Sequence, residues 1–357
     1  MKYFILIFIS GVTHASTSSI NVGNPFQKKK VSMGTFIEVP SNDILLSVDE
    51  GRASLKAKDK RIQYMPSATT RWGFNLAYQQ FDFKYKTLLF DKNSQRVEKY
   101  GKSSFHDYSG KYRVNNLIAR AFYQETKGFY ADLNSLSGTT RSDGDTEQGL
   151  LSNNTPSAVT DPIEEDIIIR NDLKATNWGL NLTYIVPVYD KNEPTALIPV
   201  SKDMKSAPFD IGFSLLSAVD YSYFTLEGSD YLLPESKRDS FSGEFKDLVG
   251  VGYQRVGVDL GLAFNWYFGD SSALKVSGQG GPGLQVSENI LHDKRSTGVK
   301  TAEHFNILLG YYFTQNNSSF ATSVEVDSWS SKLAGGNLDV QRTTFLMNYT
   351  HSVSYTH

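Results

Sequence analysis

The stretch Val256–Phe268 reads V-G-V-D-L-G-L-A-F-N-W-Y-F, and it decides the fold. Successive side chains of a β-strand point to opposite faces. One face of this stretch is therefore apolar throughout, whereas the other holds small or polar residues such as Asp259 and Asn265. The alternation lasts for the roughly 9 to 11 residues that a tilted strand needs to cross a bilayer. We expect a transmembrane strand whose apolar face meets lipid and whose polar face lines a barrel lumen.

The composition of the chain agrees with a barrel. Its 357 residues include 20 Tyr, 22 Phe and 28 Gly, which favour strands, aromatic girdles and tight turns. Beyond the first few residues, no apolar run approaches the roughly 18 residues that a membrane helix requires, which excludes a helical membrane protein. The 36 basic and 38 acidic residues nearly balance, so we expect no nucleic-acid partner. Cysteine is absent, which excludes disulfides and thiol chemistry.

The N-terminus has the pattern of a secretory signal. Residues 1–15 combine Lys2, a short apolar core and the small-x-small sequence Thr13-His14-Ala15, after which we expect cleavage. Residues 16–30 are polar and are expected to form a flexible periplasmic segment. Residues 31–357 are expected to form one barrel domain. Export to the bacterial outer membrane follows from this reading.

Strand-like segments then follow one another to the C-terminus. In the clearest hairpin, residues 72–78 and 81–89 alternate apolar and polar side chains, and Trp178–Tyr184 nearly repeats the first of them. Two further strands are expected over 112–124 and 128–135, joined by a turn at 125–127. The alternating last segment, 343–355, is expected to close the barrel and to be read by the barrel-assembly machinery.

The count of segments predicts the size of the barrel. It is about thirteen, whereas a bacterial barrel has an even number of strands. We therefore predict an all-β protein, a single closed antiparallel transmembrane β-barrel of about 12 strands, with 10 or 14 as alternatives.

Two longer stretches interrupt the rhythm, near residues 139–176 and 227–246. Both are expected to be exterior loops, because outer-membrane barrels keep their short turns in the periplasm. The first carries the acidic cluster Asp161, Glu164, Glu165 and Asp166. A solvated loop is favoured over a cation site, because no calcium-loop spacing occurs. Outer-membrane lipid and lipopolysaccharide are the expected surroundings, and the pattern does not predict an oligomeric state.

Several short motifs resemble those of a known family. They are Tyr64-Met-Pro66, Trp72–Tyr78, Tyr123-Gln124 with Lys127–Tyr130, Gly281–Gln285, and Gly310-Tyr311. Together they resemble an uncharacterised family of bacterial outer-membrane β-barrels, a domain of unknown function. The resemblance would cover most of the mature chain, although Ser67 stands where such families have Asn. It implies the barrel fold and no activity.

Charged residues on the polar faces of the expected strands suggest what the lumen does. The candidate lumen-lining residues are Asp82, Lys84, Lys86, Arg120, Asp259, Glu325 and Asp327. Both signs occur, so we expect a weakly selective channel for small solutes. Neutralising Lys84 and Lys86 together is expected to shift the ion preference without loss of folding. A non-conducting structural or adhesive barrel, closed by paired charges, is the first alternative.

The second alternative is a lipid-modifying enzyme. Ser103, Ser104, His106 and Asp107 are neighbours in sequence, but no G-x-S-x-G element accompanies them. No H-x-x-x-H or H-E-x-x-H spacing supports a zinc site, and His106, His292 and His304 are expected in or beside loops. The glycine-rich stretch at 278–283 lacks the lysine of a phosphate loop. We predict no catalytic residue, no metal site and no cofactor.

Overall fold

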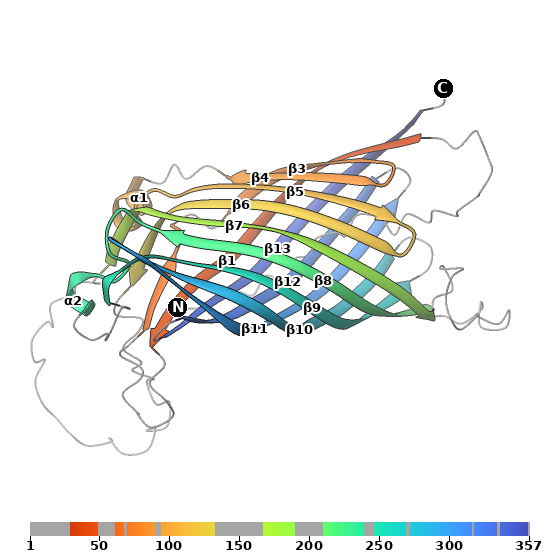
Figure 1. Cartoon of the computed structure of the whole chain (residues 1–357). Helices are drawn as coiled ribbons and strands as arrows, with labels where there is room; N and C mark the ends of the chain where they lie inside the picture. The colour runs from red at the N-terminus through yellow and green to blue at the C-terminus, as the bar shows by residue number, and fades with distance from the viewer. Residues whose placement is uncertain are drawn as a thin grey trace, which may run out of the picture.

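The structure, a computed structural model, is a closed antiparallel β-barrel (Figure 1). It describes residues 29–48, 61–67, 70–89, 94–132, 167–189, 210–238, 246–268, 272–315, 318–333 and 336–355. The strands are β1 (Lys29–Val48), β2 (Arg61–Met65), β3 (Arg71–Tyr78), β4 (Phe81–Leu88), β5 (Ser104–Val114), β6 (Leu117–Asp132), β7 (Ile167–Tyr189), β8 (Asp210–Glu227), β9 (Leu248–Phe268), β10 (Ser272–Leu291), β11 (Arg295–Gln315), β12 (Ser318–Leu333) and β13 (Gly336–Tyr355). Two short helices, α1 (Ser94–Tyr100) and α2 (Glu235–Arg238), lie in connections between strands.

The barrel closes where its last strand meets its first. β13 and β1 pair along their whole lengths, with Lys29 opposite Tyr355 at one end and Val48 opposite Gly336 at the other. β2 and β3 share one place in the wall, because β1 pairs with both of them at different heights. The thirteen segments therefore form a twelve-stranded barrel, which confirms the predicted fold and its even strand number.

The two ends of the barrel differ in their connections. Two-residue turns at 79–80 and 115–116 lie at the end where β1 begins and β13 ends. Both helices lie at the opposite end (Figure 1). Short connections also occur at the second end, such as residues 334–335 between β12 and β13, and residues 190–209 make a longer connection at the first end. The longest connection, residues 133–166 between β6 and β7, is nevertheless at the second end. Outer-membrane barrels place their long loops outside the cell, so we name the first end periplasmic and the second exterior. In the described part of the chain, no helix is long and apolar enough to cross a membrane.

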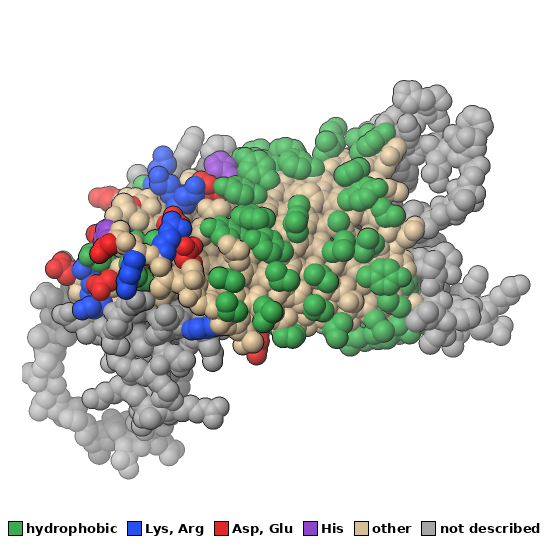
Figure 2. Space-filling model, viewed as in Figure 1, with side chains coloured by type: hydrophobic (Ala, Val, Ile, Leu, Met, Phe, Trp, Pro, Cys, Tyr) green, Lys and Arg blue, Asp and Glu red, His purple; other side chains and the backbone are tan. Residues whose placement is uncertain are grey.

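The outer face of the wall is apolar. Figure 2 shows hydrophobic side chains spread over the wall and charged side chains gathered at the exterior end. In the middle of β9, Leu262 is 44% exposed, whereas the next residue, Ala263, points inward and is 4% exposed. The apolar row of Val256–Phe268 therefore faces outward, where lipid rather than water covers it.

Some predicted boundaries were wrong. The residues expected to form a turn, 125–127, lie inside β6. The turn that joins β5 to β6 is at residues 115–116 instead. The alternation breaks there because Gly128, with φ of 82°, forms a bulge in the pairing of β6 with β7. Other predicted non-strand residues lie in strands: 167–176 in β7, and 29–30 in β1.

Two further predictions fall largely on residues that the structure does not describe. The expected signal peptide and most of the expected periplasmic segment lie within residues 1–28. The acidic cluster lies within residues 133–166. The second expected loop corresponds to the connection between β8, which ends at Glu227, and β9, which begins at Leu248.

Candidate functional site

The charged residues predicted to line the lumen are Asp82, Lys84, Lys86, Arg120, Asp259, Glu325 and Asp327. In β4, the aromatic residues Phe81 and Phe83 are exposed on the outer face, so alternation turns the three charged residues of that strand inward. The same alternation turns the other four inward. Strands from the two halves of the chain face each other across the lumen. Glu325 of β12 lies within electrostatic range of Arg120 of β6.

Lys86 belongs to a buried network centred on Glu38, which is fully buried. The Lys86 ammonium lies 2.8 Å from Glu38 and 3.1 Å from Asp107. Arg71 donates to Glu38 over 3.2 Å, and its guanidinium lies 3.4 Å from the centre of the Phe105 ring. These residues lie on β1, β3, β4 and β5. The network therefore ties four strands together through charge-assisted hydrogen bonds.

Asp259 and Asp327 belong to a second network. Arg255 donates to Asp220 and, over 3.4 Å, to Asp259. Asp259 in turn lies 2.5 Å from Nδ1 of His304, and Asp327 lies 2.8 Å from its Nε2. An imidazole with a carboxylate at each nitrogen donates to both only as an imidazolium cation. The network thus joins three carboxylates to two basic side chains across β8, β9, β11 and β12.

The position of His304 corrects the expectation that it lies in or beside a loop. It lies inside β11, and its ring stacks on the Trp329 indole with centroids 5.6 Å apart. Oxygen and nitrogen atoms of Asp220, Asp259 and His304 lie within 4.8 Å of one another, a spacing that suits a metal ion. Arg255 already bonds to both carboxylates, so a metal ion there would have to displace a guanidinium.

The glycine-rich stretch of β10 makes room for Arg255. A Cβ atom on Gly283 would lie 2.7 Å from Nε of Arg255. The Gly281 carbonyl accepts a hydrogen bond of 3.3 Å from the same guanidinium. The stretch therefore serves close packing in a strand. Its glycines leave room for a large buried side chain to lie against the inner face of the wall.

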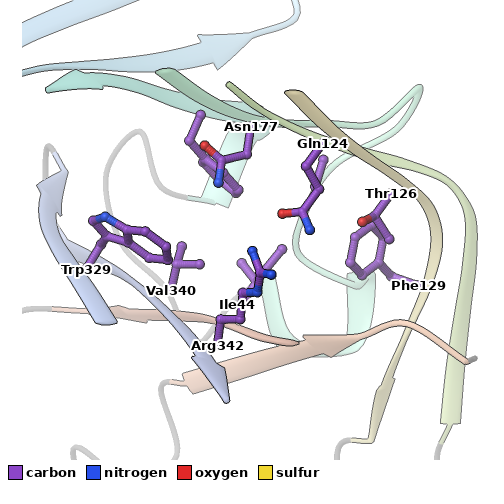
Figure 3. Close-up of a pocket in the computed structure, with 10 residues that line it drawn as sticks. Ile44, Gln124, Thr126, Phe129, Asn177, Trp329, Val340 and Arg342 are labelled. Carbon is purple, nitrogen blue, oxygen red and sulfur yellow. The ribbon is translucent and has the colours of Figure 1, made fainter. Parts of the chain in front are cut away.

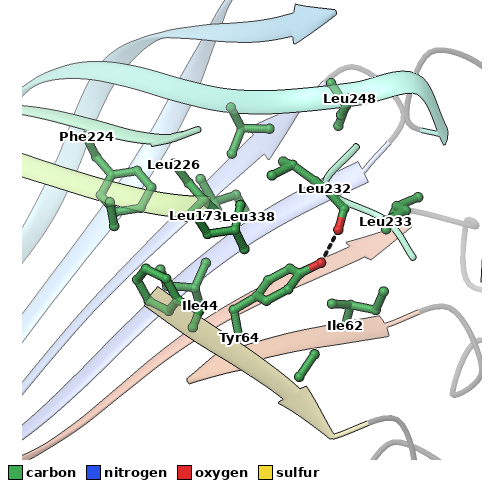
Figure 4. Packing of buried hydrophobic residues seen from close by; sticks show 14 of the residues in the cluster. Ile44, Ile62, Tyr64, Leu173, Phe224, Leu226, Leu232, Leu233, Leu248 and Leu338 are labelled. Carbon is green, nitrogen blue, oxygen red and sulfur yellow. Dashed lines mark hydrogen bonds between the residues drawn. The ribbon is translucent and has the colours of Figure 1, made fainter. Parts of the chain in front are cut away.

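Apolar side chains fill the exterior end of the lumen, and Figure 4 shows how they pack. This apolar plug consists of Ile44, Ile62, Tyr64, Phe129, Ala131, Leu173, Ala175, Phe224, Leu226, Leu232, Leu233, Leu248, Val251, Tyr253 and Leu338. Its members come from β1, β2, β6, β7, β8, β9, β13 and the connection that follows β8. Leu338 on β13 and Leu226 on β8, which are not neighbouring strands, are both fully buried. Side chains from separate parts of the wall therefore meet inside the barrel.

Polar contacts hold the connection after β8 in the plug. Arg170 donates to the carbonyls of Tyr231 and Leu232 over 2.5 and 3.3 Å. Asp172 accepts the N–H of Ser229 over 3.0 Å, and it also receives two hydrogen bonds from Arg170. These bonds lower the pKa of Asp172, which lies at the exterior end of β7 against the connection, below its ordinary value. The connection is thus fixed to β7 by charged groups.

A small cavity lies directly beneath the plug. Its volume is about 40 Å³, which is room for a few water molecules. Gln124, Asn177 and Arg342 extend toward it beside the Trp329 indole (Figure 3). Nε2 of Gln124 and Oδ1 of Asn177 are buried and have no hydrogen-bond partner in the described protein, so water is their natural partner. The cavity marks the boundary between the apolar plug and the polar lumen.

The serine, histidine and aspartate residues near position 105 are not brought together. Oγ of Ser103 donates to the Gly128 carbonyl and bonds to Ser67, inside the wall. His106 is exposed on the outer face, beside the Tyr85 hydroxyl. Asp107 points inward to Lys86. Ser104 and His106 are both exposed on the outer face, whereas Ser103 is buried and Asp107 points inward. The four residues therefore do not form a catalytic triad.

A family model and several solved structures match this chain. Solved structures similar to this chain include the outer membrane protease OmpT from Escherichia coli, with 10% identity, a TM-score of 0.37 and coverage of 95% of this chain and 100% of that one. The COG4313 outer membrane channel from Pseudomonas putida F1 shares 10% identity, with a TM-score of 0.29 and coverage of 93% and 97%. The translocator domain of the autotransporter NalP from Neisseria meningitidis shares 9%, with a TM-score of 0.35 and coverage of 94% and 92%. No curated protein matches the sequence. Residues 26–326 match a family model, and the chain belongs to the family described as Domain of unknown function (DUF4421).

Proposed function

We propose that this chain is a barrel of the bacterial outer membrane that is closed at rest. Its lumen is a polar chamber on the periplasmic side, and the apolar plug separates that chamber from the exterior. The observation that carries the proposal is the complete burial of Leu232, Leu233 and Leu248 among side chains from several strands.

The physical reason is the cost of moving an ion through an apolar constriction. Water leaves a narrow passage lined by hydrophobic side chains, and an ion cannot keep its hydration shell there. The two charge networks below the plug add to the closure, because their groups bond to one another rather than to water. These features favour the non-conducting alternative over a permanently open, weakly selective channel.

Planar-bilayer recording on the refolded chain tests this proposal. We expect no steady conductance from the wild type. The double variant Leu232→Asp, Leu233→Asp brings two charges into the plug and is expected to conduct, because hydrated carboxylates admit water. Glu235→Gln, an exposed change in the same connection, should stay closed. Steady conductance by the wild type, or a folded double variant that does not conduct, would contradict the proposal.

A gated conduit is the second candidate function. It is favoured by the attachment of residues 228–232, which reach the plug from outside the wall and are held by Arg170 and Asp172. Withdrawal of this segment would open the exterior end while the strands stay paired. The variant Arg170→Gln should then show brief conducting events that the wild type lacks. The lipid-modifying alternative has its own assay, which is lipid turnover by the purified chain.

A further inference from the structure

Basic side chains gather in the periplasmic half of the lumen. Lys111 and Arg113 lie on β5 just before the periplasmic turn at 115–116, and Arg120 follows that turn on β6. Lys275 is the fourth residue of β10, which begins at the same end. Their outward neighbours in sequence, such as Tyr112, face lipid, so all four point into the lumen.

These side chains come from different sides of the barrel and still influence one another. Lys275 lies within electrostatic range of both Lys111 and Arg113. β10 and β5 are not neighbours in the sheet, so this interaction crosses the lumen. Lys111 and Arg120 are also directly opposite each other in the pairing of β5 with β6. Like charges in that position destabilise a sheet unless an anion lies between them.

The protein supplies few acidic groups to neutralise them. Lys84 of β4 joins the group as a fifth cation, and the acidic residues in range are Asp82 and Glu325. Basic side chains therefore outnumber acidic ones at this level of the lumen. In the part of the chain that the structure describes, Lys111, Arg120 and Lys275 form neither an ion pair nor a hydrogen bond through their side chains. Their positive charge is therefore available to a ligand.

The lumen has room for a ligand at this level. Arg120 faces inward and is nevertheless exposed, so open space lies beside this residue in the lumen. Lys111 and Lys275 are half-buried. The lumen thus offers partly desolvated cations that converge from two walls on an open space. Partial desolvation strengthens their attraction for an anion relative to the same charges on an outer surface.

We propose that the periplasmic half of the lumen binds a small solute that bears a phosphate or carboxylate group. The excess of basic over acidic side chains favours an anion over a neutral or cationic solute. The planar guanidinium of Arg120 matches the oxygen pair of such a group, whereas the two lysines supply point charges from either side. The occupant enters from the periplasmic side, because the apolar plug lies at the other end of the lumen.

Calorimetric titration of the refolded chain in detergent micelles tests the site, with inorganic phosphate and succinate as probes at low ionic strength. We expect saturable binding of at least one of them at one site per chain. The variants Lys111→Gln and Lys275→Gln should each weaken binding about tenfold or more, the loss expected when one charged partner is removed. Lys174→Gln removes an exterior lysine and should leave binding unchanged. The stronger of the two probes identifies the oxyanion class.

A stability measurement separates a binding role from a structural one. In anion-free buffer of low ionic strength, neutralising Lys111 or Lys275 relieves repulsion, so the urea midpoint should rise or stay constant. Added phosphate or succinate should raise the midpoint of the wild type more than that of either variant. A fall of the midpoint in both variants, the absence of saturable binding, or binding that all three variants retain equally would overturn the proposal. The experiment is independent of the plug, because conductance is not its readout.

Discussion

The phenol of Tyr64 on β2 donates a hydrogen bond to the backbone carbonyl of Leu232, which follows it by 168 residues (Figure 4). Both residues are completely buried in the apolar plug. β2 and β3 together occupy one strand position in the wall, and β2 forms its exterior part. There β2 pairs with β1 and β6. The bond therefore connects the shortest strand of the barrel to the connection that fills its exterior end.

Removing this hydrogen bond should loosen the plug without unfolding the barrel. We expect Tyr64→Phe to lower the free energy of unfolding by about 1 kcal/mol, the net value of one such bond. The loss is small because Arg170 also donates to the Leu232 carbonyl. Urea unfolding of the refolded chain measures it. Since the chain has no cysteine, a single Leu232→Cys label site can report exposure to a membrane-impermeant maleimide.

The label separates a local effect from a global one. In the Tyr64→Phe background, Cys labelling at position 232 should become faster while the heat-dependent gel shift of the folded barrel is kept. Tyr112→Phe, on the outer face near the periplasmic end, should change neither quantity. Equal labelling rates with and without the Tyr64 hydroxyl would show that the bond does not hold the plug.

The attachment of the connection after β8 should depend on pH. Hydrogen bonds from Arg170 keep the pKa of Asp172 below its ordinary value of 3.8, because they stabilise the carboxylate. A group whose pKa is lowered in the folded state stabilises that state above its ordinary pKa, and the stabilisation is lost as the pH falls. Maleimide reacts with the thiolate, so the rate at position 232 is compared with that of a free thiol at the same pH. This relative rate should rise below about pH 4 in the wild type. Asp172→Asn should show fast labelling at neutral pH and a much weaker pH dependence.

Alternation, together with composition, predicted the β-barrel, and it assigned each candidate charged residue to the polar face of its strand. It succeeded in β9 because successive side chains of a strand alternate between its two faces whatever the size of the barrel. Arg255 could have been found by extending the same pattern one residue toward the N-terminus. It failed at Gly128, where a bulge shifts the pairing by local backbone geometry. It also missed Glu38, because the apolar and polar residues around it gave no predicted strand.

The plug and the networks could not be predicted, because they depend on which strands face each other across the lumen. Tyr64 and Leu232 meet only once the barrel has closed, and no sequence period relates them. The three carboxylates around Arg255 and His304 come from β8, β9 and β12. Charges on separate strands can equally line a wet channel, so the pattern left the open and closed barrels as alternatives.

Lys86 should be essential for stability, contrary to the expectation that it can be neutralised freely. Lys86→Met leaves Glu38 and Asp107 buried with one cation fewer, and breaking a buried pair costs about 3 to 5 kcal/mol. We expect a loss near the lower end, because Arg71 still bonds to Glu38. Urea unfolding should show this loss for Lys86→Met and none for Lys111→Met, which removes an unpaired cation. A neutral effect of Lys86→Met would mean that the Glu38 network does not stabilise the barrel.

Gly283 should not tolerate a side chain. Gly283→Leu places carbon atoms where the Arg255 side chain lies against the inner face of the wall, since even a Cβ would lie 2.7 Å from its Nε. Displacing Arg255 leaves Asp220 and Asp259 without their cation, so we expect poor refolding, judged by the heat-dependent gel shift. Gly278→Leu is the matched control, because a Cβ there meets its nearest atom only at 3.9 Å. Equal refolding of the two variants would separate the glycine from the Arg255 network.

The two faces of β9 should respond differently to the same substitution. Leu262 lies in the middle of the strand on the outer face and is 44% exposed, so in the membrane it contacts lipid. Leu262→Arg places a charge in hydrocarbon, at a cost of about 2 to 4 kcal/mol near the bilayer midplane.

Asn265→Arg, three residues later on the inward face, places the same charge in the polar lumen opposite Lys275. The inward face is polar, so the cost of Asn265→Arg should be smaller than that of Leu262→Arg, and it should fall further with added salt, which screens the repulsion from Lys275. Folding into lipid vesicles, followed by urea titration, measures both variants. Equal costs, or a larger cost for Asn265→Arg at high salt, would contradict the assignment of the two faces.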